Sequence, residues 1–142
     1  MIRREFIVGS GATLLLTACG GPKDTIVEIT ANAAAGANGP LPLAIGVFQL
    51  RDTGKFLTAG QTAMNDAATA LGADLAGQDQ LTLVGGGSAE KTIKFAPDAT
   101  SIGVFAYFKD SAGKNVRASA AVKAGKTQKI TITADASGVS LG

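Results

Sequence analysis

Short segments in which apolar and polar residues alternate run through residues 25–141, and they restrict the possible folds more than any other feature of the sequence. In the first of them, Val27 and Ile29 alternate with Glu28 and Thr30. This period of two is typical of a β-strand with one face in a core and the other in water. Further segments of this kind lie at residues 43–50, 81–83, 93–95, 102–108, 117–122, 130–133 and 139–141. About eight short strands separated by turn residues predict a mainly β protein, an antiparallel β-sandwich.

The segment at residues 102–108 carries apolar side chains on both faces, because Phe105 and Tyr107 occupy the face that should be polar. Such a strand needs a second cover. Between residues 58 and 71 the alternation stops, and the apolar spacing becomes that of one helix face, with Met64, Ala67, Ala68 and Leu71 at i, i+3, i+4 and i+7. Gly72 follows, where a left-handed cap residue is common. We expect one short helix here, covering the second face of the sheet.

The first 24 residues have the composition of an export signal followed by a lipid-attachment site. Arg3 and Arg4 precede an apolar stretch over residues 6–18, which is too short for a membrane-spanning helix of about 20 residues and suits a secretory signal. Leu16-Thr17-Ala18-Cys19 matches the bacterial lipobox. This predicts a signal peptide at 1–18, an acylated Cys19 with a tether at 19–24, and a folded domain at 25–142.

The export signal leaves lipidation and the export route open, and the residue after Cys19 bears on the final membrane. An ordinary signal peptide with a chance cysteine is the alternative to lipidation, and export could follow the Sec or the twin-arginine route. Gly20 stands where an aspartate often retains lipoproteins in the inner membrane. We therefore expect an outer-membrane protein, anchored by lipid on the periplasmic face.

The residue inventory excludes several kinds of chemistry. The chain has no histidine and one cysteine, so it cannot build a Ser-His-Asp triad or an ordinary zinc site. We expect no catalytic residues, no metal and no cofactor. The formal net charge is +2, and no run of like charges occurs. The sequence therefore contains no charged segment that would bind nucleic acid, and no polybasic membrane-binding segment.

Several short motifs follow one another in an order that resembles the TssJ lipoproteins of type VI secretion systems. The matching residues are Asn32, Gly39 and Pro40, then Val47-Phe48-Gln49-Leu50-Arg51-Asp52, Phe56, Leu71-Gly72-Ala73-Asp74-Leu75, and Asp79, Leu81 and Leu83. Where the family commonly has a Trp-Arg pair, this chain has Val116-Arg117. The resemblance implies a transthyretin-like sandwich with a small helical addition. It also implies a partner, the periplasmic C-terminal region of the inner-membrane protein TssM, with TssL completing a trans-envelope complex.

In the TssJ family, the loop between the first two strands takes part in binding TssM. The corresponding loop here spans residues 32–41, which is longer than most hairpin loops. The resemblance makes its members the candidate partner-binding residues: Asn32, Ala37, Asn38, Gly39, Pro40 and Leu41. Residues 49–52 are expected to be structural.

Together these features favour a non-catalytic scaffold anchored in the outer membrane. The alternative is a periplasmic lipoprotein that binds a small molecule or a glycan. Sugar sites usually stack rings on aromatic side chains, and this chain has no tryptophan and one tyrosine.

Overall fold

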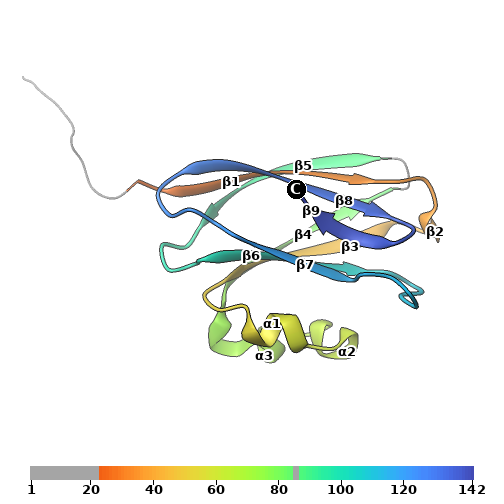
Figure 1. Cartoon of the computed structure of the whole chain (residues 1–142), viewed down its shortest axis with the longest axis horizontal. Coiled ribbons are helices and arrows are strands. Elements are labelled where there is room, and N and C mark those ends of the chain that lie inside the picture. Colours follow the sequence, from red (N-terminus) through yellow and green to blue (C-terminus); the bar gives the residue numbers. More distant parts are fainter. Residues whose placement is uncertain (1–22, 85–86) are drawn as a thin grey trace, which may run out of the picture.

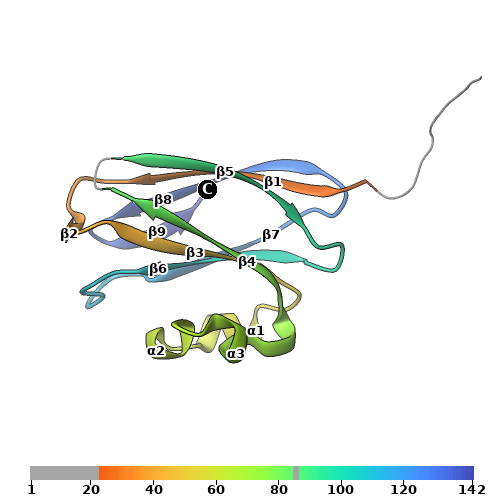
Figure 2. The same cartoon turned by 180° about the vertical axis from the view of Figure 1, so that it is seen from behind.

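A computed structural model describes residues 23–84 and 87–142 as two β-sheets packed face to face, with a layer of short helices against one of them (Figures 1 and 2). The predicted signal peptide, the lipobox with Cys19, and Gly20 lie outside the described residues. The same holds for Gly85 and Gly86.

Each sheet has four strands. The first sheet has the order β5-β1-β8-β9, formed by Ser88–Phe95, Thr25–Ala33, Thr127–Asp135 and Gly138–Leu141. The second has the order β4-β3-β6-β7, formed by Leu75–Leu83, Leu43–Leu50, Ser101–Tyr107 and Arg117–Ala121. The prediction of a mainly β sandwich of about eight strands is confirmed.

One strand pair departs from the antiparallel pattern. Strands β1 and β8 run parallel, with Ile26 opposite Thr127 and Ala33 opposite Ala134, whereas every other pair is antiparallel. Parallel neighbours cannot be joined by a tight hairpin, and here most of the domain lies between them in sequence. Alternation within a strand reports burial and not direction, so the sequence could not reveal this pairing.

The main core fills the space between the two sheets. Val27 is completely buried and Ile29 nearly so, while Glu28 and Thr30 are half-buried on the outer face of β1. The other strands supply the remaining buried residues in the same alternating manner, among them Leu43, Ile45, Val47, Leu81, Leu83, Ile93, Phe95, Ile102, Val104, Ile130 and Ile132.

The helical segment is more broken than predicted. In place of one helix, the chain forms α1 (Gly54–Thr58), α2 (Gln61–Met64) and α3 (Ala67–Leu71), followed by a 3₁₀ turn at Gly72–Asp74. Asp66 interrupts the helix because its carboxylate accepts hydrogen bonds from the backbone N–H and the hydroxyl of Thr69, and so caps α3. Ala68, predicted to face the sheet, is instead exposed, because the buried face of α3 consists of Ala67 and Leu71 alone. In the part of the chain that the structure describes, no helix is long and apolar enough to cross a bilayer.

These helices cover the outer face of the second sheet, as predicted, and close a second core (Figure 2). Its members are Phe48, Leu50, Phe56, Met64, Ala67, Leu71 and Phe105. Gly103 of β6 leaves room for the ring of Phe56, since a Cβ at this position would lie 2.9 Å from that ring. The hydroxyl of Tyr107 donates a hydrogen bond to the carbonyl of Met64 at 2.8 Å, which fastens α2 to β6.

The strands run between two ends of the sandwich, which we call the tether end and the loop end (Figure 1). The tether end contains the start of β1 and the turns at residues 96–100 and 122–126. The loop end contains the connections at residues 34–42, 108–116 and 136–137. Nine residues of β1 at about 3.3 Å each place the two ends about 30 Å apart.

Candidate partner-binding site

Residues 37–41, part of the predicted partner-binding loop, fold into a short strand and a turn at the loop end. Strand β2 covers Ala37–Pro40. Gly36 and Gly39 have φ of +77° and +60°, a conformation that residues with a Cβ rarely adopt. The predicted loop at residues 32–41 is therefore shorter than expected, because residues 32–33 still belong to β1 and residues 37–40 form β2.

Asn38 fixes this segment to the turn that follows β6. Its side-chain oxygen accepts a hydrogen bond from the backbone N–H of Lys109 at 2.8 Å, and its side-chain nitrogen donates to the carbonyl of Pro42 at 2.8 Å. Both ends of the amide are thus occupied within the fold. Asn38 holds the loop in position, and its neighbours present the free surface.

The segment after β6 is itself held in place by the turn between β8 and β9. The backbone N–H of Asn115 donates to the carbonyl of Ser137 at 2.9 Å, and that of Val139 donates to the carbonyl of Asn115 at 2.8 Å. Gly138 has φ of +128°, and a Cβ there would lie 2.3 Å from the carbonyl oxygen of Asn115. Only glycine fits this contact, which gives the loop end a fixed shape.

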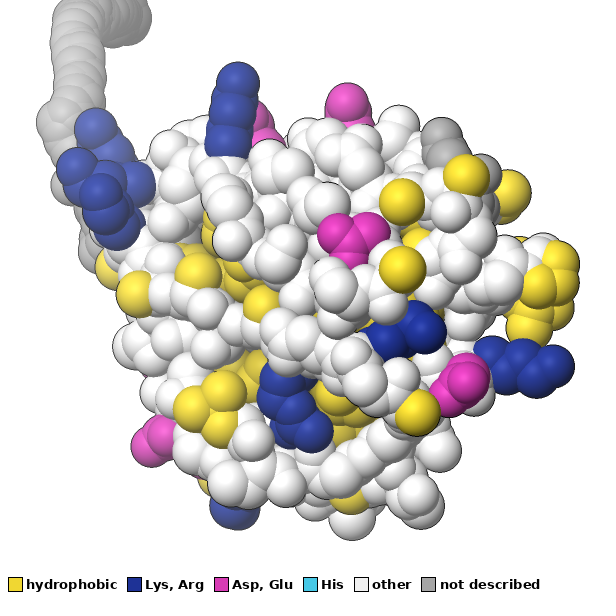
Figure 3. Space-filling model, turned by 45° about the vertical axis from the view of Figure 1, so that its right-hand side comes forward, with side chains coloured by type: hydrophobic (Ala, Val, Ile, Leu, Met, Phe, Trp, Pro, Cys, Tyr) yellow, Lys and Arg dark blue, Asp and Glu magenta, His cyan; other side chains and the backbone are white. Residues whose placement is uncertain are grey.

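A groove of about 320 Å³ opens between these two segments. It is lined by residues 36–41 on one side and by Lys109, Asp110 and Lys114 on the other. Leu41 is 40% exposed at its rim. The surface view shows hydrophobic side chains gathered beside lysine or arginine at this end of the molecule (Figure 3). The groove therefore combines an apolar patch with charged neighbours.

The structure brings together five of the six predicted partner-binding residues: Ala37, Asn38, Gly39, Pro40 and Leu41. Asn32 is separate from them. It lies in β1, opposite Ser88 and Thr133, and is exposed on the outer face of the first sheet. Lys109, Asp110 and Lys114 were missed, because about 70 residues separate them from the loop and only the fold makes them neighbours.

The segment at residues 49–52 makes contacts within the fold, as expected of a structural segment. The side-chain oxygen of Gln49 accepts a hydrogen bond from the backbone N–H of Ala96 at 2.8 Å. The guanidinium of Arg51 bonds to the carboxylate of Asp98 at 2.6 Å and to two carbonyls near the start of β4. The hydrogen bond from Arg51 lowers the pKa of the Asp98 carboxyl below its usual value.

Arg117 of β7 joins the second sheet to the helical layer. Its guanidinium donates hydrogen bonds to the carbonyls of Phe56 and Ala59, at the middle and end of α1. It also lies 5.2 Å from the ring centre of Phe105 and 5.9 Å from that of Phe56. Burial lowers the pKa of this guanidinium, since desolvation disfavours the charged form. Those carbonyls and ring faces must therefore offset the cost of desolvation.

We expect Arg117→Met to destabilise the domain by about 2–3 kcal/mol, because two half-buried carbonyls lose a charged donor. Urea unfolding would measure the free energy of unfolding, with Lys129→Met, an exposed position on β8, as the control. Arg117→Lys should recover part of the loss. A change below about 0.5 kcal/mol, the usual range for surface substitutions, would show that Arg117 does not hold the helical layer.

A second groove, of about 380 Å³, lies between the α2–α3 junction and strand β4. Its lining includes Asn65, Gln78, Gln80 and the ring of Tyr107. Among the described residues, no group of three or more acidic or cysteine side chains is placed to hold a metal ion.

Comparison with known proteins identifies the family. A family model described as "Type VI secretion lipoprotein, VasD, EvfM, TssJ" matches residues 25–137. The chain belongs to this family of type VI secretion lipoproteins. The resemblance stated from the sequence motifs is therefore confirmed. Among curated proteins, none matches the chain.

Solved structures of TssJ-family proteins share the fold. Lip of Serratia marcescens, described as a membrane-bound component of the type VI secretion system, is 26% identical, with a TM-score of 0.77 over 84% of this chain and 96% of its own. TssJ1 of Pseudomonas aeruginosa is 22% identical, with a TM-score of 0.72 over 86% of this chain and 96% of its own.

A third similar chain belongs to a structure described as "T6SS protein TssM C-terminal domain (869-1107) from EAEC". It is 21% identical to this TssJ-family chain, with a TM-score of 0.64, and the match covers 84% of this chain and 98% of that one.

Proposed function

We propose that this TssJ-family lipoprotein is a non-catalytic scaffold of a type VI secretion system. An acyl group on Cys19 anchors it in the outer membrane on the periplasmic side, and its loop end binds the periplasmic C-terminal region of TssM. Through TssM it is joined to TssL and to the rest of the trans-envelope complex.

The family match over residues 25–137 is the observation on which this proposal chiefly depends. The structural comparisons support the choice of partner, because chains with this fold occur in one structure described as a type VI membrane complex and in another described by the TssM C-terminal domain.

The arrangement of the two ends also supports the proposal. A chain anchored at Cys19 enters the sandwich at the tether end, and the loop end lies at the other end of the strands (Figure 1). The groove between residues 36–41 and the turn after β6 thus faces away from the membrane, toward a partner that rises from the inner membrane.

The direction of the strands suits a scaffold under load. A pull between the two ends acts along β1, which is hydrogen-bonded to β5 on one side and to β8 on the other over eight residue pairs each. Inter-strand hydrogen bonds lie across the strands, so such a pull loads many of them in shear at once. The composition of the groove agrees with an interface that has an apolar centre and a polar rim.

Co-purification with TssM tests the proposal. The acylated protein, extracted in detergent, should retain the purified periplasmic C-terminal region of TssM at micromolar concentration and moderate salt. Absence of retention under these conditions would refute TssM as the direct partner.

A further inference from the structure

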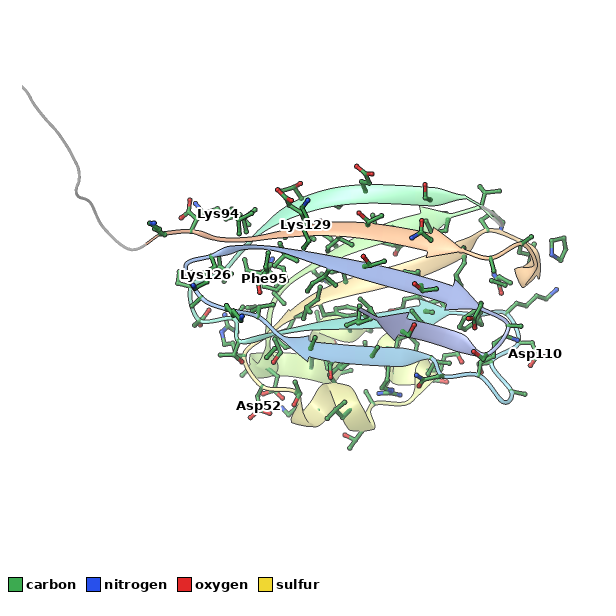
Figure 4. All side chains as sticks on the ribbon, turned by 45° about the horizontal axis from the view of Figure 1, so that its top comes forward. Asp52, Lys94, Phe95, Asp110, Lys126 and Lys129 are labelled. Carbon is green, nitrogen blue, oxygen red and sulfur yellow. The ribbon has the colours of Figure 1, made fainter. Side chains whose placement is uncertain are left out.

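Four exposed lysines from three separate segments meet at the tether end. Strand β1 is flanked there by the last residues of β5 on one side and by the turn before β8 on the other, since Ile26 lies opposite both Lys94 and Thr127. Figure 4 shows Lys94 and Lys126 beside the point where the described chain begins, and Figure 3 shows cationic side chains gathered at this end. We call the four the tether-end lysines: Lys23, Lys94, Lys123 and Lys126.

The turn that carries two of these lysines is firmly held. The side chain of Gln128 accepts a hydrogen bond from the backbone N–H of Lys123 at 2.9 Å and donates to its carbonyl at 3.0 Å. The hydroxyl of Thr25, a buried residue of β1, accepts from the backbone N–H of Gly125 at 2.8 Å. The turn is therefore fixed against the first residue of β1, and its lysines stay beside the start of the strand.

Among the residues that the structure describes, few carboxylates oppose the tether-end lysines. Asp24 lies 3.5 Å from Lys94, and both side chains are more than half exposed, so this pair neutralises one of the four charges at most. Asp98 is already bonded to Arg51, and Asp52 lies on the side of the helical layer (Figure 4). The first sheet is thus positively charged at the tether end, although no run of lysines exists in the sequence.

The same end is the one held close to the membrane under the proposed function, on which this inference rests. From Cys19 to Lys23 the chain spans four residues, which reach about 14 Å when fully extended. That reach is comparable to the distance of about 8–10 Å over which salt screens charges. Lysines around this point therefore lie within the electrostatic range of a membrane surface.

We propose that the tether-end lysines contact the anionic headgroups of the membrane to which the protein is anchored. Contacts on both sides of β1 orient the strands away from the bilayer, so that the loop end is presented to its partner. A short tether alone limits distance but leaves tilt free, and the lysines supply the missing restraint.

Labelling of lysines in the vesicle-bound protein tests this contact. The acylated protein, beginning at Cys19, is reconstituted into vesicles of phosphatidylcholine alone, or of phosphatidylcholine mixed with phosphatidylglycerol. An amine-reactive reagent then modifies each lysine at a rate measured by mass spectrometry. We expect the tether-end lysines to react roughly fivefold more slowly in the anionic vesicles at low salt, the attraction expected for one lysine near such a surface. High salt should abolish the difference.

Two double variants with the same charge change sharpen the test. Lys123→Gln with Lys126→Gln should restore fast labelling of Lys23 and Lys94 in anionic vesicles. Lys109→Gln with Lys114→Gln, at the loop end, should leave that labelling unchanged. Equal labelling of the tether-end lysines in neutral and anionic vesicles, or equal protection of Lys109 and Lys114, would overturn the proposal.

Failure of the anchor can be told apart from failure of the contact. Flotation of the protein with neutral vesicles, together with its mass, reports acylation independently of charge. If the protein proves to lack an acyl group, coupling Cys19, the only cysteine of the chain, to a maleimide lipid gives the same membrane attachment. The labelling result then decides the lysine contact in the same way.

Discussion

Replacement of Cys19 by serine is expected to remove the protein from the outer membrane. The lipobox interpretation makes the thiol the acceptor of the acyl group, and a serine hydroxyl does not take its place. Each buried CH₂ of an acyl chain contributes about 0.8 kcal/mol to membrane binding, so losing whole chains removes the anchor. The share of protein in the outer-membrane fraction should fall more than tenfold, and its mass should lack the acyl group.

A neighbouring substitution provides the control for this result. Gly20→Asp keeps Cys19 and introduces the residue that often retains lipoproteins in the inner membrane. We expect this variant to keep the acyl mass and to move to the inner-membrane fraction. If Cys19→Ser remained in the outer-membrane fraction with an unchanged mass, Cys19 would not be the anchor.

Introducing a charge at Leu41 is expected to weaken the binding of TssM by about thirtyfold, equal to about 2 kcal/mol. Leu41 is the large hydrophobic residue at the rim of the loop-end groove, and it is 40% exposed. A partner that covers it gains the burial of an apolar side chain, and Leu41→Glu replaces that gain with a carboxylate to be desolvated. Isothermal titration with the TssM periplasmic region would measure the dissociation constant.

Leu57→Glu is the matched control, because Leu57 is also an exposed leucine, 52% accessible, but lies on α1 in the helical layer. We expect the dissociation constant of this variant to stay within twofold of the original. Equal weakening by both substitutions would mean that TssM does not bind preferentially at the loop end. No weakening by Leu41→Glu would place the interface elsewhere on the sandwich.

The strands and their buried faces could be predicted from the sequence because alternation is a local property. Val27, Ile29, Ile130 and Ile132 point into the core wherever their strands lie in the sheets. The second core was also predictable in outline, since Phe105 and Tyr107 require a cover. The break of the helix at Asp66 was not predicted, because an apolar face at helical spacing is preserved when three short helices replace one.

Only one side of the loop-end groove could be predicted from the sequence. Residues 37–41 were identified by family resemblance, whereas Lys109 and Lys114 are brought beside them by the pairing of β3 with β6 and by the hydrogen bond from Lys109 to Asn38. Nothing in the local sequence around Lys109 indicates that contact.

By itself, the sequence determined the eight strands of the two sheets and their buried faces, the need for a helical cover, and the family to which the chain belongs. The tertiary structure alone decided that β1 runs parallel to β8, that residues 36–41 share a groove with the turn after β6, and that Lys23, Lys94, Lys123 and Lys126 surround one end. The physical reason is that alternation encodes which face of a strand meets water, while the choice of neighbouring strand depends on contacts between residues far apart in the chain.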